Sequence, residues 1–313
     1  MVNRRQFMQS SLALVVVPAA AADPPPAPSP AKLVLLGTKG GPTLRGPAQL
    51  PSSNVLLVGG DAYVVDAGYG VTLRLAQAKV PLRSIRSVYI THHHSDHNLE
   101  LGALLYNAWV DSATHPIEVY GPEGIEPLLA NWFDANRFDI ETRMADEGRS
   151  DPRALVHAHR YRAGLVSETA AVRVTALRNE HPPISESYAL RFDFRGGKSV
   201  VFSGDTAFFP PLAEFAKDCD YLVHEAMYGP AMDRLVRLNP AAKTLNEHLH
   251  AAHTLTTDVG RIAAKANARN LVLTHFVPSG DASVKPEDWL SGVRENYHGN
   301  VILARDLLEV PLE

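Results

Sequence analysis

Residues 87–98 read S-V-Y-I-T-H-H-H-S-D-H-N. The run from Val88 to Thr91 is apolar and rich in β-branched residues, which predicts a buried strand. Three histidines, an aspartate and a fourth histidine follow at once, in the loop where that strand ends. Loops at the carboxyl ends of strands are where open α/β sheets place their functional sites. The sequence therefore predicts a site at this strand end.

This loop holds four candidate metal ligands within six residues. His92 and His94 lie two positions apart, so they point the same way in extended backbone. Imidazole and carboxylate groups together suit zinc and related divalent ions. One ion can take His92 and His94, while a neighbouring ion takes Asp96 and His97. His93 points away from the first pair and is predicted not to be a ligand. A solvated histidine-rich loop would leave this density of ligands unexplained.

Three later residues repeat the pattern of a strand followed by a metal-binding side chain. His181 follows one predicted strand and can complete the ligand set of the first ion. His275 ends another, within L-V-L-T-H-F, and can close the set of the second ion. Asp205 follows a third strand. Two nearby cations repel each other, and a shared carboxylate reduces that repulsion, so Asp205 is predicted to bridge them.

The pattern His-x-His-x-Asp-His after a strand resembles the signature of the metallo-β-lactamase superfamily. This resemblance implies an α/β fold, the αββα four-layer sandwich, and two Zn²⁺ ions between the sheet edges. It implies one hydrolase domain over residues 32–313. It also implies that Asp66 supports the metal loop from behind. The implied metal ligands are His92, His94, Asp96, His97, His181, Asp205 and His275.

The second half of the chain resembles the tRNase Z branch and the related arylsulfatases and phosphodiesterases. The motifs that carry this resemblance are S-G-D-T at 203–206, H-E-A at 224–226 and the spacing from His253 to His275. The resemblance implies that Glu225 and His253 orient and protonate the leaving group. Asp96 is expected to be catalytic as well as a ligand. Met227 departs from the threonine usual after His-Glu-Ala.

Composition sets the remaining bounds on the body of the chain. The 313 residues are 45% hydrophobic, which suits a globular protein with a sizeable core. Cys219 is the single cysteine, so an internal disulfide and a cysteine metal site are both excluded, and it is expected in the core. The formal charge is −4, so the chain lacks the excess of basic residues expected of a protein that binds nucleic acid or anionic lipid.

Residues 1–22 resemble a twin-arginine signal peptide, with Arg4-Arg5, an apolar run and closing alanines. The run is too short to span a bilayer, which needs ~20 apolar residues. No cysteine follows it, so no lipid anchor is expected there. Residues 23–31 form a proline-rich linker. These features predict a periplasmic protein without a membrane anchor.

Three observations favour a small substrate. Only 23 residues separate His181 from Asp205, where tRNase Z usually carries a long tRNA-gripping arm. Removing residues 1–22 loses two arginines and no acid, so the mature chain is more acidic. Export would separate it from precursor tRNA. We therefore expect an exported di-zinc hydrolase of a small phosphodiester or sulfate ester, with a small-molecule ester and no nucleic acid as partner.

Other functions stay open at this stage. They are a tRNase Z-like 3′ tRNA endoribonuclease, a β-lactamase, which the bridging Asp205 argues against, and a zinc-binding or scavenging protein without turnover. A homodimer is left open as the oligomeric state. No role is assigned to His248, to His250 or to residues 138–161, where 138–150 shows no clear pattern. His157 and His159 are expected to be surface residues of a strand, and 301–310 is predicted as one final strand.

Overall fold

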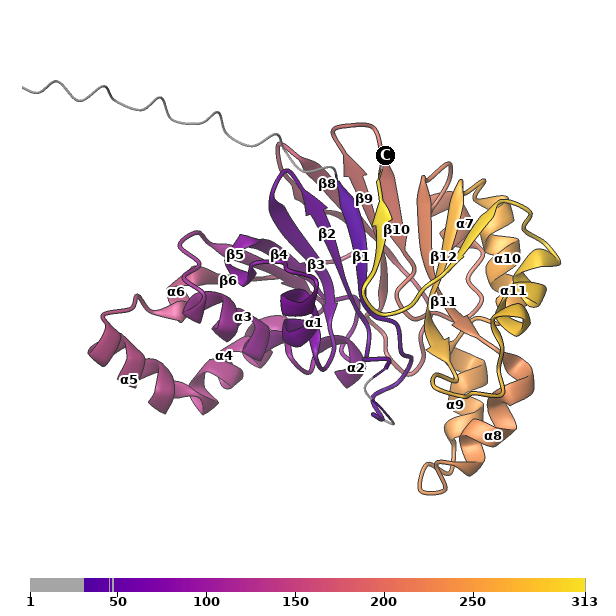
Figure 1. Ribbon diagram of the computed structural model, residues 1–313, viewed down its shortest axis with the longest axis horizontal. Helices are drawn as coiled ribbons and strands as arrows, with labels where there is room; N and C mark the ends of the chain where they lie inside the picture. Colours follow the sequence, from indigo (N-terminus) through magenta and orange to yellow (C-terminus); the bar gives the residue numbers. More distant parts are fainter. Residues whose placement is uncertain (1–30, 45, 47, 313) are drawn as a thin grey trace, which may run out of the picture.

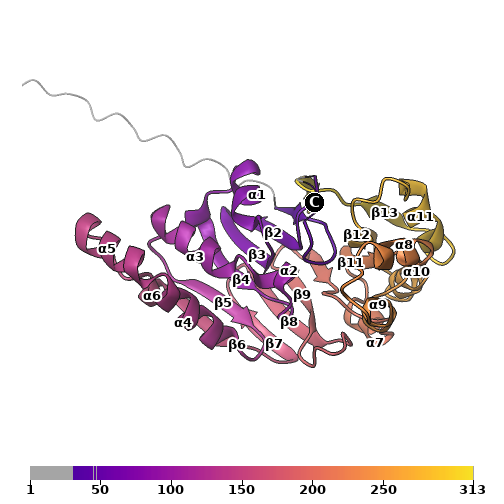
Figure 2. The same ribbon diagram turned by 90° about the horizontal axis from the view of Figure 1, so that it is seen from below.

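Two seven-stranded sheets pack against each other and carry helices on their outer sides (Figure 1, Figure 2). The computed structural model describes residues 31–44, 46 and 48–312. The predicted α/β sandwich of four layers is confirmed. The signal peptide expected at 1–22 lies outside the described residues, as does nearly all of the linker expected at 23–31. Within the part of the chain that is described, no helix has the length and apolar character needed to cross a membrane.

The first sheet is built mainly from the N-terminal half. Its strands, in spatial order, are β14 (Leu308–Pro311), β1 (Lys32–Gly37), β2 (Ser53–Val58), β3 (Asp61–Ala67), β4 (Ile85–Tyr89), β5 (Ile117–Gly121) and β6 (Val156–Arg160). The strands β3 to β6 run parallel, so their carboxyl ends meet at one edge. The helices and 3₁₀ turn of this half are α1 (Val71–Gln77), η1 (Leu82–Ser84), α2 (Ser95–Asn98), α3 (Leu101–Val110), α4 (Ile125–Ala135), α5 (Arg137–Glu147) and α6 (Pro152–Leu155).

The second sheet takes the C-terminal half. Its order is β13 (Asn300–Leu303), β12 (Asn270–Val277), β11 (Tyr221–Met227), β10 (Ser199–Phe202), β9 (Tyr188–Phe194), β8 (Val172–Arg178) and β7 (Gly164–Glu168). The strands β10 to β13 are parallel, again with their carboxyl ends at one edge. The helices and 3₁₀ turn here are α7 (Pro211–Phe215), η2 (Gly229–Ala231), α8 (Met232–Arg237), α9 (Leu245–Ala252), α10 (Thr256–Lys265) and α11 (Pro286–Arg294).

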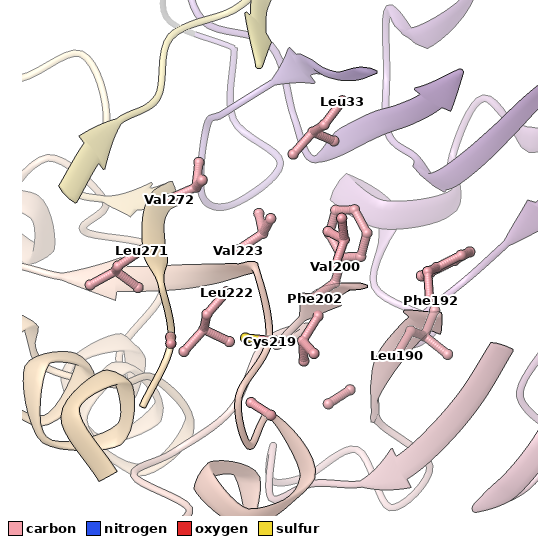
Figure 3. Close-up of a cluster of buried hydrophobic side chains, with 14 of the residues drawn as sticks. Leu33, Leu190, Phe192, Val200, Phe202, Cys219, Leu222, Val223, Leu271 and Val272 are labelled. Atoms are coloured by element: carbon pink, nitrogen blue, oxygen red, sulfur yellow. The ribbon is translucent and has the colours of Figure 1, made fainter. Parts of the chain in front are cut away.

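The core follows from the alternation of side chains along buried strands. In β1, Leu33 and Leu35 belong to the cluster shared with the second sheet, whereas Val34 and Leu36 belong to the cluster under the outer helices. Both faces of the strand are therefore covered, which explains its continuous apolar run. Figure 3 shows Leu33 in the same cluster as residues of the second sheet. Cys219 is fully buried in this cluster, as expected, and burial raises the pKa of its thiol to about 12.

One prediction of secondary structure is wrong, and one helix was not predicted. The predicted final strand over 301–310 is two strands, because the chain leaves the second sheet after β13 and crosses to pair β14 with β1. Asp306 fixes the crossing, since its carboxylate accepts from the backbone of Thr38 and Leu50 and from Arg74. Residues 138–150 also contain most of helix α5. Of its residues only Ile140 is buried, so no apolar stripe marks this helix in the sequence.

Candidate metal centre

The seven candidate ligands meet where the carboxyl ends of strands from both sheets come together. Four follow β4, and the others follow β8 and β10 or lie in β12. They form two groups in which all donor atoms lie within 4.8 Å of one another. Asp205 belongs to both groups. The first group is His92, His94, His181 and Asp205, and the second is Asp96, His97, Asp205 and His275.

The nitrogens of the first group surround one point. Nδ1 of His94 lies 3.1 Å from Nε2 of His92 and 3.1 Å from Nε2 of His181. The Oδ2 atom of Asp205 lies 3.9 Å from the first of these Nε2 atoms and 4.0 Å from the second. Tetrahedral zinc with Zn–N bonds of about 2.0–2.1 Å separates neighbouring ligand atoms by roughly 3.3 Å. These side chains therefore fit a single divalent cation.

The second group has similar spacing. Nε2 of His97 lies 3.3 Å from Nε2 of His275. Oδ2 of Asp205 is 3.3 Å and 3.2 Å from these two nitrogens. Oδ2 of Asp96 is 3.4 Å from His275 and 3.6 Å from His97. One oxygen of Asp205 thus faces both groups, which is the placement that a bridging ligand needs.

Hydrogen bonds behind the rings fix which nitrogen faces the centre. Nδ1 of His97 contacts Oδ2 of Asp66 at 2.7 Å, and Nδ1 of His181 donates to the carbonyl of Ala252 at 2.8 Å. Asp66 also accepts from the backbone N–H of Thr91 at 2.8 Å. A second hydrogen bond of this kind orients the histidine ligands of metal sites. Asp66 therefore lies behind the metal loop, where the resemblance placed it.

The charge states also suit metal binding. Burial lowers the pKa of His92 well below its usual value, so this ring is neutral. Burial raises the pKa of Asp205, but His275 and His97 outweigh it and hold that pKa well below its usual value. Three carboxylates around His97, led by Asp205, overcome burial and raise its pKa well above the usual value. A bound cation would displace that proton, because metal ligands bind deprotonated.

Glu225 and His253 form a second feature beside the ligands. Glu225 lies in β11, and His253 follows the end of α9. Nδ1 of His253 lies 2.9 Å from Oε2 and 3.1 Å from Oε1 of Glu225, and the backbone N–H of Thr206 donates to Oε1 at 2.8 Å. Burial lowers the pKa of His253, but the Glu225 carboxylate raises it to about 9. The ring therefore keeps a proton at neutral pH that it can donate.

An open cleft of about 330 Å³ gives access to the centre. Its walls include Asp96, Asp205, His253 and His275. The cleft is also lined by His248 and by residues of α8 and α9, which the sequence did not assign to the site. The one signal for His248 was its position five residues before His253 in a polar stretch.

The histidines expected to lie outside the centre do so. His93 bonds to Nδ2 of Asn98 at 2.9 Å and belongs to none of the ligand groups among the described residues. His157 and His159 are exposed on β6, where they bond to the two carboxylate oxygens of Glu118. Glu225, His253 and His275 form a third close group, but there Nδ1 of His253 is already engaged by Glu225.

Residues 62–276, more than half of the chain, match the family described as the beta-lactamase superfamily domain. The chain belongs to this superfamily, and its fold and ligand cluster are those of a metal-dependent hydrolase. The resemblance to the metallo-β-lactamase superfamily and its tRNase Z-like branch is confirmed.

Individual proteins narrow the comparison. The chain is 29% identical over 288 residues to a protein named Ribonuclease Z from Mycobacterium avium, an alignment that covers 90% of this chain and 98% of the relative. The fold matches the metallo-beta-lactamase fold protein YhfI from Bacillus subtilis with a TM-score of 0.66 at 21% identity, covering 90% and 99% of the two chains. It matches human tRNase Z, short form, with a TM-score of 0.64 at 21% identity and the same coverage.

These findings correct two expectations, namely that the substrate is a small ester and that nucleic acid is not a partner. The expectation of a small substrate depended largely on the short interval between His181 and Asp205, which contains no tRNA-gripping arm. However, the 288-residue alignment covers 90% of this chain and 98% of the relative. The relative therefore does not carry an additional arm of tens of residues that this chain lacks. The negative net charge was also a poor argument against a nucleic-acid partner, because it sums over the whole chain and does not describe the charge around the site. The relatives that cover nearly the whole chain are named Ribonuclease Z, a name that makes RNA their substrate.

Proposed function

We propose that the chain is a di-zinc endoribonuclease of the tRNase Z type, which hydrolyses one phosphodiester bond at the 3′ end of precursor tRNA. The observation that carries the proposal is the similarity to Ribonuclease Z over 98% of that relative's length. The Glu225–His253 pair beside the ligand cluster supports it, because breaking an RNA strand requires a proton for the departing ribose oxygen.

The chain's residues divide into those that hold cations and those that handle the substrate. His92, His94 and His181 would hold the first cation. Two zinc ions supply, when bound, a water acidified towards neutral pH and positive charge beside the phosphoryl oxygens. Asp205 keeps the two positions close together. Asp96 has a structural part as well, since its Oδ2 accepts from the backbone N–H of Gly41 and so ties the loop at the cleft wall to the centre.

His253 delivers the proton to the leaving oxygen. Its Nδ1–H is held by Glu225, so Nε2–H is the donor available to the cleft, which His253 lines. Because Glu225 stabilises the charged ring, the proton is present at neutral pH. The negative charge of Glu225 then remains to reorient the neutral ring after transfer.

Precursor tRNA with a 3′ trailer tests the proposal. Purified, zinc-loaded protein should make one cut at the 3′ boundary, a chelator should abolish it, and added zinc should restore it. The same RNA with a scrambled acceptor stem controls for non-specific cleavage. Absence of the 3′ cut while an aryl phosphodiester is turned over rapidly would refute the tRNA assignment.

A further inference from the structure

One wall of the cleft comes from the segment between β11 and His253. Figure 1 shows α8 and α9 beyond the ends of β11 and β12. From α9, Leu245, His248 and Leu249 line the cleft. Leu249 also packs in a small cluster with Met232 of α8, which joins the two helices. The segment therefore presents a half-buried imidazole and two leucines to the cleft in front of the metal ligands.

His248 faces the ligand cluster without belonging to it. Its ring centre lies 6.1 Å from that of His94, 6.0 Å from that of His181 and 5.8 Å from that of His253. It is in none of the ligand groups found among the described residues. His248 is thus positioned beside both the first metal group and the proton donor.

The helix that carries His248 is fixed to the centre. The carbonyl of Ala252, the last residue of α9, accepts from Nδ1 of His181 at 2.8 Å. Thr254 follows, and its hydroxyl donates to the carbonyl of Thr206 at 2.6 Å while its own carbonyl accepts from the backbone N–H of Met227 at 2.9 Å. These bonds hold α9 in register with the metal ligands, so His248 is preorganised with respect to any group bound there.

We propose that His248 is a substrate-binding residue whose imidazole N–H donates to a non-bridging oxygen of the scissile phosphate. This rests on the proposed function, because it assigns the residue to the phosphodiester of the same reaction. An oxygen hydrogen-bonded to an imidazole lies roughly 4 Å from the ring centre. Two rings 5.8 Å apart, His248 and His253, can therefore both reach oxygens of one phosphate. Leu245 and Leu249 line the same cleft as His248 and add apolar surface to its wall.

Binding of inorganic phosphate to the zinc-loaded full chain tests this without requiring turnover. In isothermal titration calorimetry, His248→Ala should weaken phosphate binding by roughly 10- to 100-fold, the range for a lost hydrogen bond to a charged group. Its zinc content should be unchanged. His248→Asn keeps an N–H donor and should recover part of the affinity. The matched control is His250→Ala, which removes an exposed histidine of the same helix and should change neither quantity.

The outcomes separate the proposal from its alternatives. Unchanged phosphate affinity in His248→Ala with full zinc content would mean that the ring only supports the fold, and would overturn the proposal. Loss of one zinc equivalent would make His248 a ligand and would also overturn it. Wild-type protein that binds phosphate through His248 but leaves precursor tRNA intact would refute the tRNase Z assignment and sustain the phosphate contact.

Discussion

Replacing His253 by alanine removes the proton donor and leaves the predicted metal ligands in place. Glu225 raises the pKa of His253 to about 9, so the ring is almost fully protonated at pH 7 and its whole contribution is lost in the variant. Loss of general acid catalysis lowers kcat by roughly 10²–10⁴-fold, or about 3–5.5 kcal/mol in the barrier. Zinc content should stay at the wild-type value, because the ring engages Glu225 in the described structure.

Substrates whose leaving groups differ in their need for a proton show whether His253 is the proton donor. A ribose oxygen needs a proton as it departs, whereas p-nitrophenolate departs without one. Single-turnover rates on RNA and on bis(p-nitrophenyl) phosphate should therefore diverge, with the full loss on RNA and less than about tenfold on the aryl ester. His250→Ala serves as the control. An equal loss on both substrates, or loss of zinc from the variant, would refute the assignment of His253 as proton donor.

Three further predictions concern the surroundings of the centre. Glu225→Gln removes the carboxylate that raises the pKa of His253, so the alkaline fall in RNA cleavage should begin at lower pH than in the wild type; an unmoved pH profile would contradict this. Asp66→Asn should weaken zinc binding roughly 10–100-fold, measured in competition with a chromophoric chelator, because His97 loses its charged partner. The control is Asp61→Asn at the exposed start of β3, which should not change zinc binding. Burial lowers the pKa of His224 from 6.5 to about 4. Between these two pH values only the unfolded chain binds a proton at this ring, so the folded state loses stability as the pH falls from 6.5 to 4. The loss is on the order of 3 kcal/mol in urea unfolding of the metal-free chain, and an identical pH dependence in His224→Gln would disprove it.

The clustering of the candidate ligands could be predicted from the sequence because its signal is local. Each predicted ligand follows a strand or lies near its carboxyl end, and parallel strands bring their carboxyl ends to a common edge. His92, His181 and His275 therefore meet although they are far apart in the chain. Asp66, which supports the ligands from behind, could also be predicted, because the family resemblance implied its role.

What the sequence missed depends on contacts that no periodicity records. Helix α5 buries only Ile140, so its pattern of apolar residues is too weak to mark it. The crossing between β13 and β14 depends on Asp306 contacting loops more than 200 residues away. His248 lines the cleft from α9, a helix that is held to the centre by contacts such as the bond from His181 to the carbonyl of Ala252. The prediction of a small substrate was wrong because the short interval from His181 to Asp205, the net charge and the signal peptide do not describe the surface around the cleft.

Anomalous diffraction at the zinc absorption edge, from crystals of the zinc-loaded protein, tests the dinuclear centre most directly. The account predicts two peaks at the common edge of the two sheets, with one oxygen of Asp205 touching both. The other predicted ligands are His92, His94 and His181 for the first peak, and Asp96, His97 and His275 for the second. A single peak after saturation with zinc, or peaks that do not touch Asp205, would contradict the account.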